Sequence, residues 1–234
     1  METLKFKQYL SIFLLAGLFA GCSLVGLELQ EDHEHETTIL DPDIHMSAWE
    51  FLNEPREDSL INFGLMVEGI EYAGLEEEYS KSGRTFMVLT RRAILRYNSS
   101  GSVNSGCYFG ANRVPNLDEQ GNPVLDEDGI PTTRPARSWS DYPVEQVRNM
   151  LLYHIVEGEY SYHNLGPDNI AVQPSSPVDT ANIMYLRILN DRNSRISVNN
   201  FPGSTRTLSP RTSNLKATNG YVHVFDTYLE YRTE

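Results

Sequence analysis

Apolar residues recur with regular spacings along most of the chain after residue 46. Ser47-Ala48-Trp49-Glu50 has the pattern of a capping box, in which a serine caps the first helical amides and a glutamate reaches back. This pattern predicts a short helix that ends near Asn53, since a proline follows two residues later. A second helix, capped by Asp58 or Ser59 and ending at Gly74, is predicted from apolar positions three and four residues apart: Leu60, Phe63, Val67, Ile70 and Ala73.

A third helix is predicted between Asp141, which can cap its first amides, and Gly158. Its apolar face consists of Val144, Val147, Met150, Leu151 and His154 to Ile155. Short β-prone runs, bounded mostly by Asn, Asp, Gly or Pro, predict strands at Thr85–Leu89, Met184–Leu189, Ile196–Val198 and Tyr221–Asp226. Helices followed by strands predict an α+β fold with a mostly antiparallel sheet.

Residues 98–140 differ from the flanking sequence, because Gly, Ser, Asn, Pro and acidic residues dominate them. Turn-forming residues around Gly121 and Gly129 predict a projecting hairpin. The acidic residues of this segment lack the spacing of an EF-hand calcium loop, so we interpret them as solvated turn residues. No internal repeat is visible in the chain. A connection of this length inside a compact domain is commonly functional.

The N-terminus has the features of an export signal. Lys5 and Lys7 form a basic region, and the apolar run from Ile12 to Phe19 is too short to span a bilayer. The segment that ends in Ala20-Gly21-Cys22 resembles a bacterial lipobox, which implies that residues 1–21 are removed and that Cys22 is acylated, for example with palmitate. An ordinary secretory signal is the alternative. Stable attachment requires more than one acyl chain, which lipoprotein maturation supplies.

Composition limits the partners of the mature chain. Residues 22–45 form an acidic spacer without apolar periodicity, and its His-acid alternation at residues 31–36 is more typical of a solvated linker than of a metal site. The chain carries a net charge of −13, and removal of residues 1–21 with Glu2, Lys5 and Lys7 leaves −14. Such a charge disfavours nucleic acid as a partner. With only two cysteines, neither a disulfide framework nor a cysteine zinc site is expected.

Three segments resemble the fasciclin domain, in the order in which that family uses them. The family's first strand corresponds to residues 84–90, although the usual Ala-Pro pair is missing there. Its Leu-x-Tyr-His-x-Val-x-Gly pattern matches residues 151–158, and its Asn-Gly-x-x-His-Val-x-Asp pattern matches residues 219–226. The resemblance implies a fasciclin-like domain over residues 46–232, with helices at its start and centre, a β-sandwich or wedge, and residues 98–140 as an insertion.

The matched motifs supply the candidate site residues. The resemblance implies a receptor-binding role for Tyr153 and His154, but the apolar neighbours of His154 favour a hydrogen-bonded imidazole in the interior. His223 is likewise expected to pack on a strand. Asn219 and Gly220 are expected to form the positive-φ turn before that strand.

Other residues were considered for contacts with partners. Cys107 is expected to be buried, or else to form an intermolecular disulfide. Exposed tyrosines can stack on sugar rings or anchor a protein, and the tyrosines considered for this role are Tyr160, Tyr162, Tyr228 and Tyr231.

These observations suggest a noncatalytic binding or adhesion module, lipid-anchored in the outer membrane on its periplasmic or cell-surface face, that recognises a protein or a glycan. One alternative is an accessory lipoprotein of an outer-membrane nutrient transporter, and another is an envelope scaffold joined through Cys107 or the hairpin. A polymer-acting hydrolase is disfavoured, because the acids cluster in turns and no motif of a known catalytic class is present. No cofactor is expected.

Overall fold

A computed structural model describes residues 41–55, 62–177, 182–189, 195–202, 204 and 207–230. The chain divides into two units, Met1–Leu40 and Asp41–Glu234, and every element below belongs to the second unit. The predicted signal peptide, Cys22 and most of the predicted acidic spacer therefore lie outside the described residues. None of the helices in these ranges has the length and apolarity that crossing a bilayer requires.

The first helix has the bounds that the sequence predicted, whereas the second ends as predicted but begins only after Phe63. Helix α2 (Ala48–Asn53) begins with the predicted capping box between Ser47 and Glu50. Helix α3 (Gly64–Ala73) ends at Gly74, whose left-handed backbone (φ 61°) directs its N–H back to the carbonyls of the last turn. The proposed caps Asp58 and Ser59 lie outside the described residues.

Helix α6 (Val144–Tyr153) is shorter at both ends than the sequence predicted. Asp141 does not cap it, which corrects the prediction. Asp141 instead ends a short 3₁₀ helix, η3 (Trp139–Asp141), and its carboxylate reaches back to the start of that turn. At the other end, Ile155 pairs with Phe86 as the first residue of strand β4 (Ile155–Glu157), so sheet pairing replaces the expected last helical turn.

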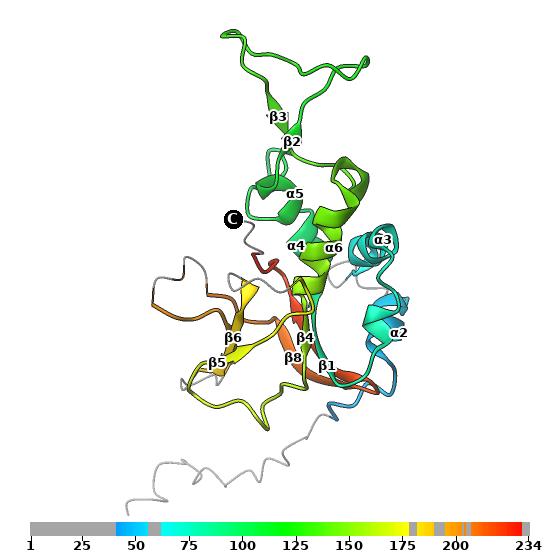
Figure 1. The fold of residues 1–234 in the computed structure, drawn as a ribbon, viewed down its shortest axis with the longest axis vertical. Helices are drawn as coiled ribbons and strands as arrows, with labels where there is room; N and C mark the ends of the chain where they lie inside the picture. The colour runs from blue at the N-terminus through cyan, green and yellow to red at the C-terminus, as the bar shows by residue number, and fades with distance from the viewer. Residues whose placement is uncertain are drawn as a thin grey trace, which may run out of the picture. The chain divides into compact units, whose positions relative to one another are not determined.

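The central sheet brings the two ends of the domain together (Figure 1). Its strand order is β4-β1-β9-β8, formed with β1 (Arg84–Leu89), β8 (Thr212–Ala217) and β9 (Gly220–Phe225). Strands β1 and β9 run parallel from the Arg84–Gly220 pair to the Leu89–Phe225 pair. The other pairs in this sheet are antiparallel. Residues 85–89 of β1 are all buried, so both faces of this strand are covered by the core, which explains the unbroken apolar run from Phe86 to Leu89.

A second, antiparallel sheet has the order β5-β6-β7 and consists of Ile170–Val172, Met184–Ile188 and Ile196–Val198. Both sheets, α3 and α6 contribute to one hydrophobic core, which includes Val88, Ile70, Leu151 and Leu186. The short elements η2 (Glu78–Ser80), α4 (Arg91–Ile94) and α5 (Tyr108–Ala111) complete this part of the fold. The α+β class and the mostly antiparallel pairing are confirmed, with the β1–β9 pair as the parallel exception.

The segment at residues 98–140 is only partly a projection. Its flanks enter the core, where Tyr108, Phe109 and Trp139 form a group of tilted and edge-to-face rings. The Trp139 indole N–H donates to the Leu65 carbonyl (2.6 Å), and the ring lies so close to Gly69 that any Cβ there would contact it. Only residues 114–134, here called the arm, extend away from the helices, through strands β2 (Val114–Pro115) and β3 (Thr133–Arg134) (Figure 1).

Candidate binding site

The motif histidines lie inside the domain, and both ring nitrogens of each one form a hydrogen bond. His154 is fully buried; its Nδ1–H donates to the Met150 carbonyl (2.8 Å), and its Nε2 accepts from the Leu229 N–H (3.0 Å). His223 is also fully buried; its Nδ1 accepts from the Asn214 N–H (3.0 Å), so the proton lies on Nε2, which donates to Tyr160 O (3.0 Å). Both rings therefore join separate backbone segments as neutral imidazoles.

Burial governs the acid-base behaviour of both histidines. Desolvation lowers the pKa of His154 and of His223 to about 4, against a weaker opposing effect from their backbone hydrogen bonds. Tyr153 is also buried, and its hydroxyl accepts from the Asn199 amide (3.1 Å). The binding role that the resemblance implies for Tyr153 and His154 stays a prediction, while their burial supports a role in packing.

Asn219 and Gly220 join three parts of the chain. The Asn219 side chain accepts from the Ala48 N–H (2.8 Å) and donates to the carbonyls of Tyr79 (2.9 Å) and Lys81 (3.2 Å). Gly220 has φ 150°, and a Cβ at this position would overlap the Arg84 carbonyl. The predicted turn is present, and Asn219 also fixes the start of α2, a contact that local sequence spacing could not reveal.

The tyrosines and Cys107 do not all lie where the sequence suggested. Tyr162 is exposed and Tyr160 is half-buried, but Tyr228 is buried edge-to-face against Tyr108, and Tyr231 lies outside the described residues. Cys107 is a free, fully buried thiol that contacts the Asn104 carbonyl (2.9 Å). A disulfide between subunits would therefore require local opening.

The arm contains a repeat that the sequence analysis missed. Residues 116–123 and 124–131 align as Asn-Leu-Asp-Glu-Gln-Gly-Asn-Pro and Val-Leu-Asp-Glu-Asp-Gly-Ile-Pro. Each copy forms one loop, here called the first loop (residues 117–123) and the second loop (residues 125–131), and each loop is closed by a bridge from its leucine to its proline. The signal was the spacing of eight residues between the two Leu-Asp-Glu triplets. The predicted projecting hairpin is present as the antiparallel β2–β3 pair, but it carries two loops at its end, which the prediction did not include.

The two loops have the same internal hydrogen bonds. In the first loop, Asp118 Oδ1 accepts from the N–H groups two and four residues later (2.9 and 2.8 Å). In the second loop, Asp126 Oδ1 does the same (3.0 and 2.9 Å). The backbone N–H of Asn122 lowers the pKa of the Asp118 carboxyl below its usual value. Positive φ at Gly121 (84°) and Gly129 (78°) completes each turn.

Three backbone hydrogen bonds join the loops at their base. The Asn116 N–H donates to Thr132 O (3.0 Å), the Val124 N–H donates to Asn116 O (2.8 Å), and the Thr132 N–H donates to Val124 O (2.8 Å). These bonds form a closed triangle at equivalent repeat positions. The Thr132 hydroxyl also donates to Val124 O (2.8 Å). The loops are therefore held to each other as well as to β2 and β3.

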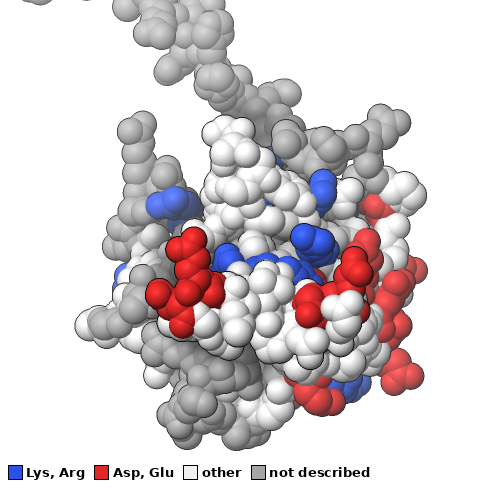
Figure 2. All heavy atoms as spheres, turned by 90° about the horizontal axis from the view of Figure 1, so that it is seen from above, with Lys and Arg blue, Asp and Glu red and all other residues white. Residues whose placement is uncertain are grey.

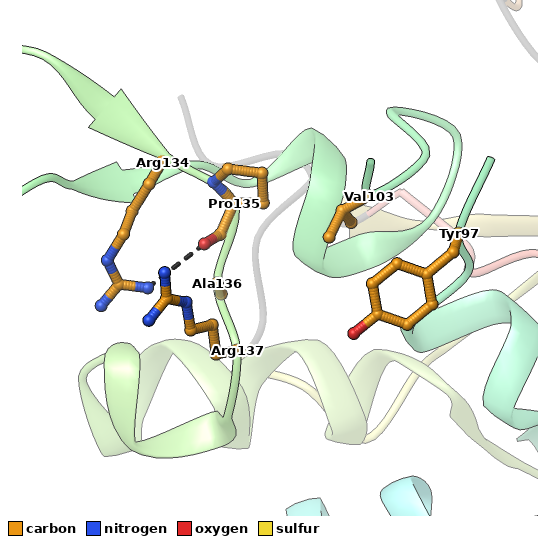
Figure 3. Close-up of a pocket in the computed structure, with 6 residues that line it drawn as sticks. All are labelled: Tyr97, Val103, Arg134, Pro135, Ala136 and Arg137. Carbon is orange, nitrogen blue, oxygen red and sulfur yellow. Dashed lines mark hydrogen bonds between the residues drawn. The ribbon is translucent and has the colours of Figure 1, made fainter. Parts of the chain in front are cut away.

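A groove lies at the base of the arm, with a volume of about 360 Å³. Figure 3 shows the Arg134 and Arg137 guanidinium groups on one side of the groove and Tyr97 and Val103 on the other. The Tyr97 ring is 57% exposed. Arg134 forms a two-pronged ion pair with Asp141 (2.7 and 3.2 Å), which lowers the pKa of Asp141 to about 2. This pair anchors β3 to η3.

Charged side chains are segregated at this end of the domain. Seen from above, Lys and Arg side chains form a central band between separate groups of Asp and Glu (Figure 2). All charged residues of the two loops are acidic, while Arg113, Arg134 and Arg137 lie at the base of the arm. In the described part of the chain, no group of three or more His, Cys, Asp or Glu side chains is arranged to hold a metal ion.

Comparison with known proteins places the fasciclin similarity in the C-terminal part of the chain. Residues 132–231 match the model of the family described as the Fasciclin domain. That match begins at the end of the arm, so both loops lie outside it. No curated protein matches this chain.

Among solved structures, the chain is similar to a FAS1 domain pair from the insect cell adhesion molecule fasciclin I. The sequences are 11% identical, the TM-score is 0.43, and the match covers 80% of this chain and 51% of the other. The chain therefore spans about half the length of that structure.

Proposed function

We propose that this protein is a noncatalytic binding or adhesion module, held at the bacterial outer envelope by acylation of Cys22, that contacts its partner through the arm. The exposure of apolar side chains on the arm carries this proposal. Of the large apolar residues that are exposed in the described ranges, more than half lie on the arm: Leu117, Val124, Leu125 and Ile130. Clustered apolar surface of this kind is typical of interaction sites.

Two further observations support a binding role. The match of residues 132–231 to the Fasciclin domain family suggests adhesion, because domains of this family are adhesion-related modules without catalytic activity. The buried histidines already have both ring nitrogens hydrogen-bonded to the backbone, so neither is positioned for acid-base chemistry on a bound substrate. An accessory role beside an outer-membrane nutrient transporter would make the partner a neighbouring membrane complex.

Removal of the arm tests the proposal directly. Because Pro115 pairs with Thr133, an Asn-Gly turn can replace residues 116–132 without changing the β2–β3 register. We expect the full-length variant to fold but to lose attachment to its partner in envelope fractions and in cell-adhesion assays. Unchanged attachment by a folded variant would contradict the proposal.

The tether has its own test. Cys22→Ser removes the thiol that acylation requires, so we expect the variant to leave the membrane fraction and to show the mass of a protein without acyl chains. Cys107→Ser is the matched control, since this buried thiol has no role in the proposed anchor. A Cys22→Ser product with unchanged mass and fractionation would rule out the lipid anchor.

Glycan binding in the groove is the second candidate function. The exposed Tyr97 ring and Arg137 line opposite sides of the groove and offer an aromatic surface and a cation, which together suit a sugar that carries a carboxylate. Binding to an array of acidic and neutral glycans, lost in Tyr97→Ala and kept in Tyr162→Ala, would support this candidate. Binding to no glycan would leave the protein-binding role alone.

A further inference from the structure

We propose that the two loops of the arm form a divalent docking surface for a protein whose contact face has apolar pockets rimmed by Lys or Arg. This inference rests on the proposed binding function and specifies the chemistry of the partner. Each loop supplies one exposed leucine followed by an acidic pair, Leu117 with Asp118-Glu119 and Leu125 with Asp126-Glu127.

The leucines are the anchors of this surface. Leu117 is 52% exposed and Leu125 is 55% exposed, and they occupy equivalent positions in the two loops. Ile130 of the second loop is 58% exposed. Burying one such side chain in a partner's pocket removes apolar surface from water and so stabilises a complex. A few well-packed side chains carry most of the binding energy of a protein interface, so two leucines that fill pockets can anchor a complex.

The charge of the loops selects the partner. Between residues 116 and 132 the arm carries five acidic residues and no Lys or Arg: Asp118, Glu119, Asp126, Glu127 and Asp128. This charge repels nucleic acid and anionic lipid, and a hydrophilic glycan offers no pocket for leucine. A protein face with apolar pockets and a basic rim complements both the leucines and the carboxylates.

The loops are organised before they bind. The triangle between Asn116, Val124 and Thr132 fixes one loop against the other, and Asp118 and Asp126 each hold their own turn through two backbone N–H groups. A surface that is ordered in advance loses little conformational entropy on binding. Two equivalent contacts on one rigid support also raise the effective concentration of the second contact.

Photo-crosslinking in the native envelope identifies the contact. A photo-reactive amino acid replaces Glu119 or Glu127, which are equivalent positions, in the full-length protein, and Val144 is the control because it is exposed outside the arm (44%). We expect both loop positions, but not residue 144, to crosslink to the same protein, at sites where apolar residues are flanked by Lys or Arg. Crosslinks only to glycan or lipid, to unrelated proteins, or to no protein would overturn the inference.

Affinity measurements with the protein identified by crosslinking then test the anchors. We expect Leu117→Ser or Leu125→Ser to weaken binding about tenfold, and the double variant to weaken it at least about a hundredfold, while Val144→Ser binds normally. Binding should also weaken when salt rises from 0.1 to about 0.5 M. If arm removal abolishes binding but the double leucine variant binds fully, the docking inference fails and the proposed function remains.

Discussion

The motif region and the arm use polar residues in opposite ways. In the motif region, the side chains of His154, His223 and Asn219 form hydrogen bonds to backbone groups inside the domain. In the arm, Asp118 and Asp126 satisfy the local backbone and leave the leucines facing solvent. The residues that make the fasciclin resemblance specific thus stabilise the fold. The surface that we propose for a partner lies on the two loops of the arm, outside the matched residues 132–231.

A pair of glycine substitutions gives the largest expected contrast. Gly220→Ala places a Cβ on the Arg84 carbonyl between two central strands, so we expect a loss of roughly 3 kcal/mol or more in the free energy of unfolding, or no folded protein. Gly121→Ala has a similarly positive φ but open space around it, and should cost about 1 kcal/mol. Denaturant unfolding measures both. Equal losses would contradict the contrast between the two regions.

The buried histidines make the domain sensitive to acid. Their pKa of about 4 in the fold lies below the unfolded value of about 6.5, so the unfolded chain binds more protons between these values. The contribution of these neutral histidines to the free energy of unfolding is therefore fully present above pH 6.5. It falls as the pH drops to 4, by roughly 2–3 kcal/mol for each histidine. Unfolding midpoints between pH 7 and 4 measure this loss, and His223→Gln should reduce its slope. A flat profile would show that the imidazoles are not buried as neutral groups.

The Arg134–Asp141 pair at the base of the arm should have a smaller effect. The folded pKa of Asp141, about 2, lies below the unfolded value of about 3.9, so its contribution is present above pH 4 and is lost as the pH falls towards 2. Asp141→Asn should cost about 1–2 kcal/mol at pH 7 and remove this acid dependence. Asp128→Asn is the control, because that carboxylate lies in an exposed turn. Equal stability of the two variants at pH 7 would contradict the anchoring role.

Removal of the arm should change stability least. Its flanking residues Tyr108, Phe109 and Trp139 remain in the core. Closing the shorter connection also costs less conformational entropy. We expect the free energy of unfolding to change by less than about 1 kcal/mol, as measured by denaturant titration. Phe109→Ala, from the buried flank, should instead cost about 3–5 kcal/mol. A large loss on arm removal would mean that the arm belongs to the folding unit.

Sequence reasoning worked where local chemistry decided the structure. The Ser47 capping box, the Gly74 stop and the apolar run of β1 are each determined by a few neighbouring residues, and each was predicted. It failed where distant partners decide. Asp141 was predicted to cap a helix, but its carboxylate forms an ion pair with Arg134. Tyr228 was considered as an exposed contact residue, but its ring packs edge-to-face against Tyr108. Neither partner follows from spacing.

The candidate site was only partly predictable for the same reason. Turn chemistry around Gly121 and Gly129 indicated a projection, and the eight-residue spacing could have revealed two loops. The triangle that joins the loops depends on backbone pairing between positions 116, 124 and 132, which no side-chain pattern encodes. The groove is lined by Tyr97 together with Arg134 and Arg137, which lie far from it in the sequence, so the sequence could not predict it.

The parallel pairing of β1 with β9 also affects when the domain can form. Strand β1 comes early in the domain and its central neighbour β9 comes late in it, so the sheet cannot close before β9 has been made. A nascent or truncated chain without β9 leaves one side of β1 unpaired. Closure of the sheet is thereby deferred until β9 has been made, and until then the unpaired edge of β1 is open to pairing with other chains.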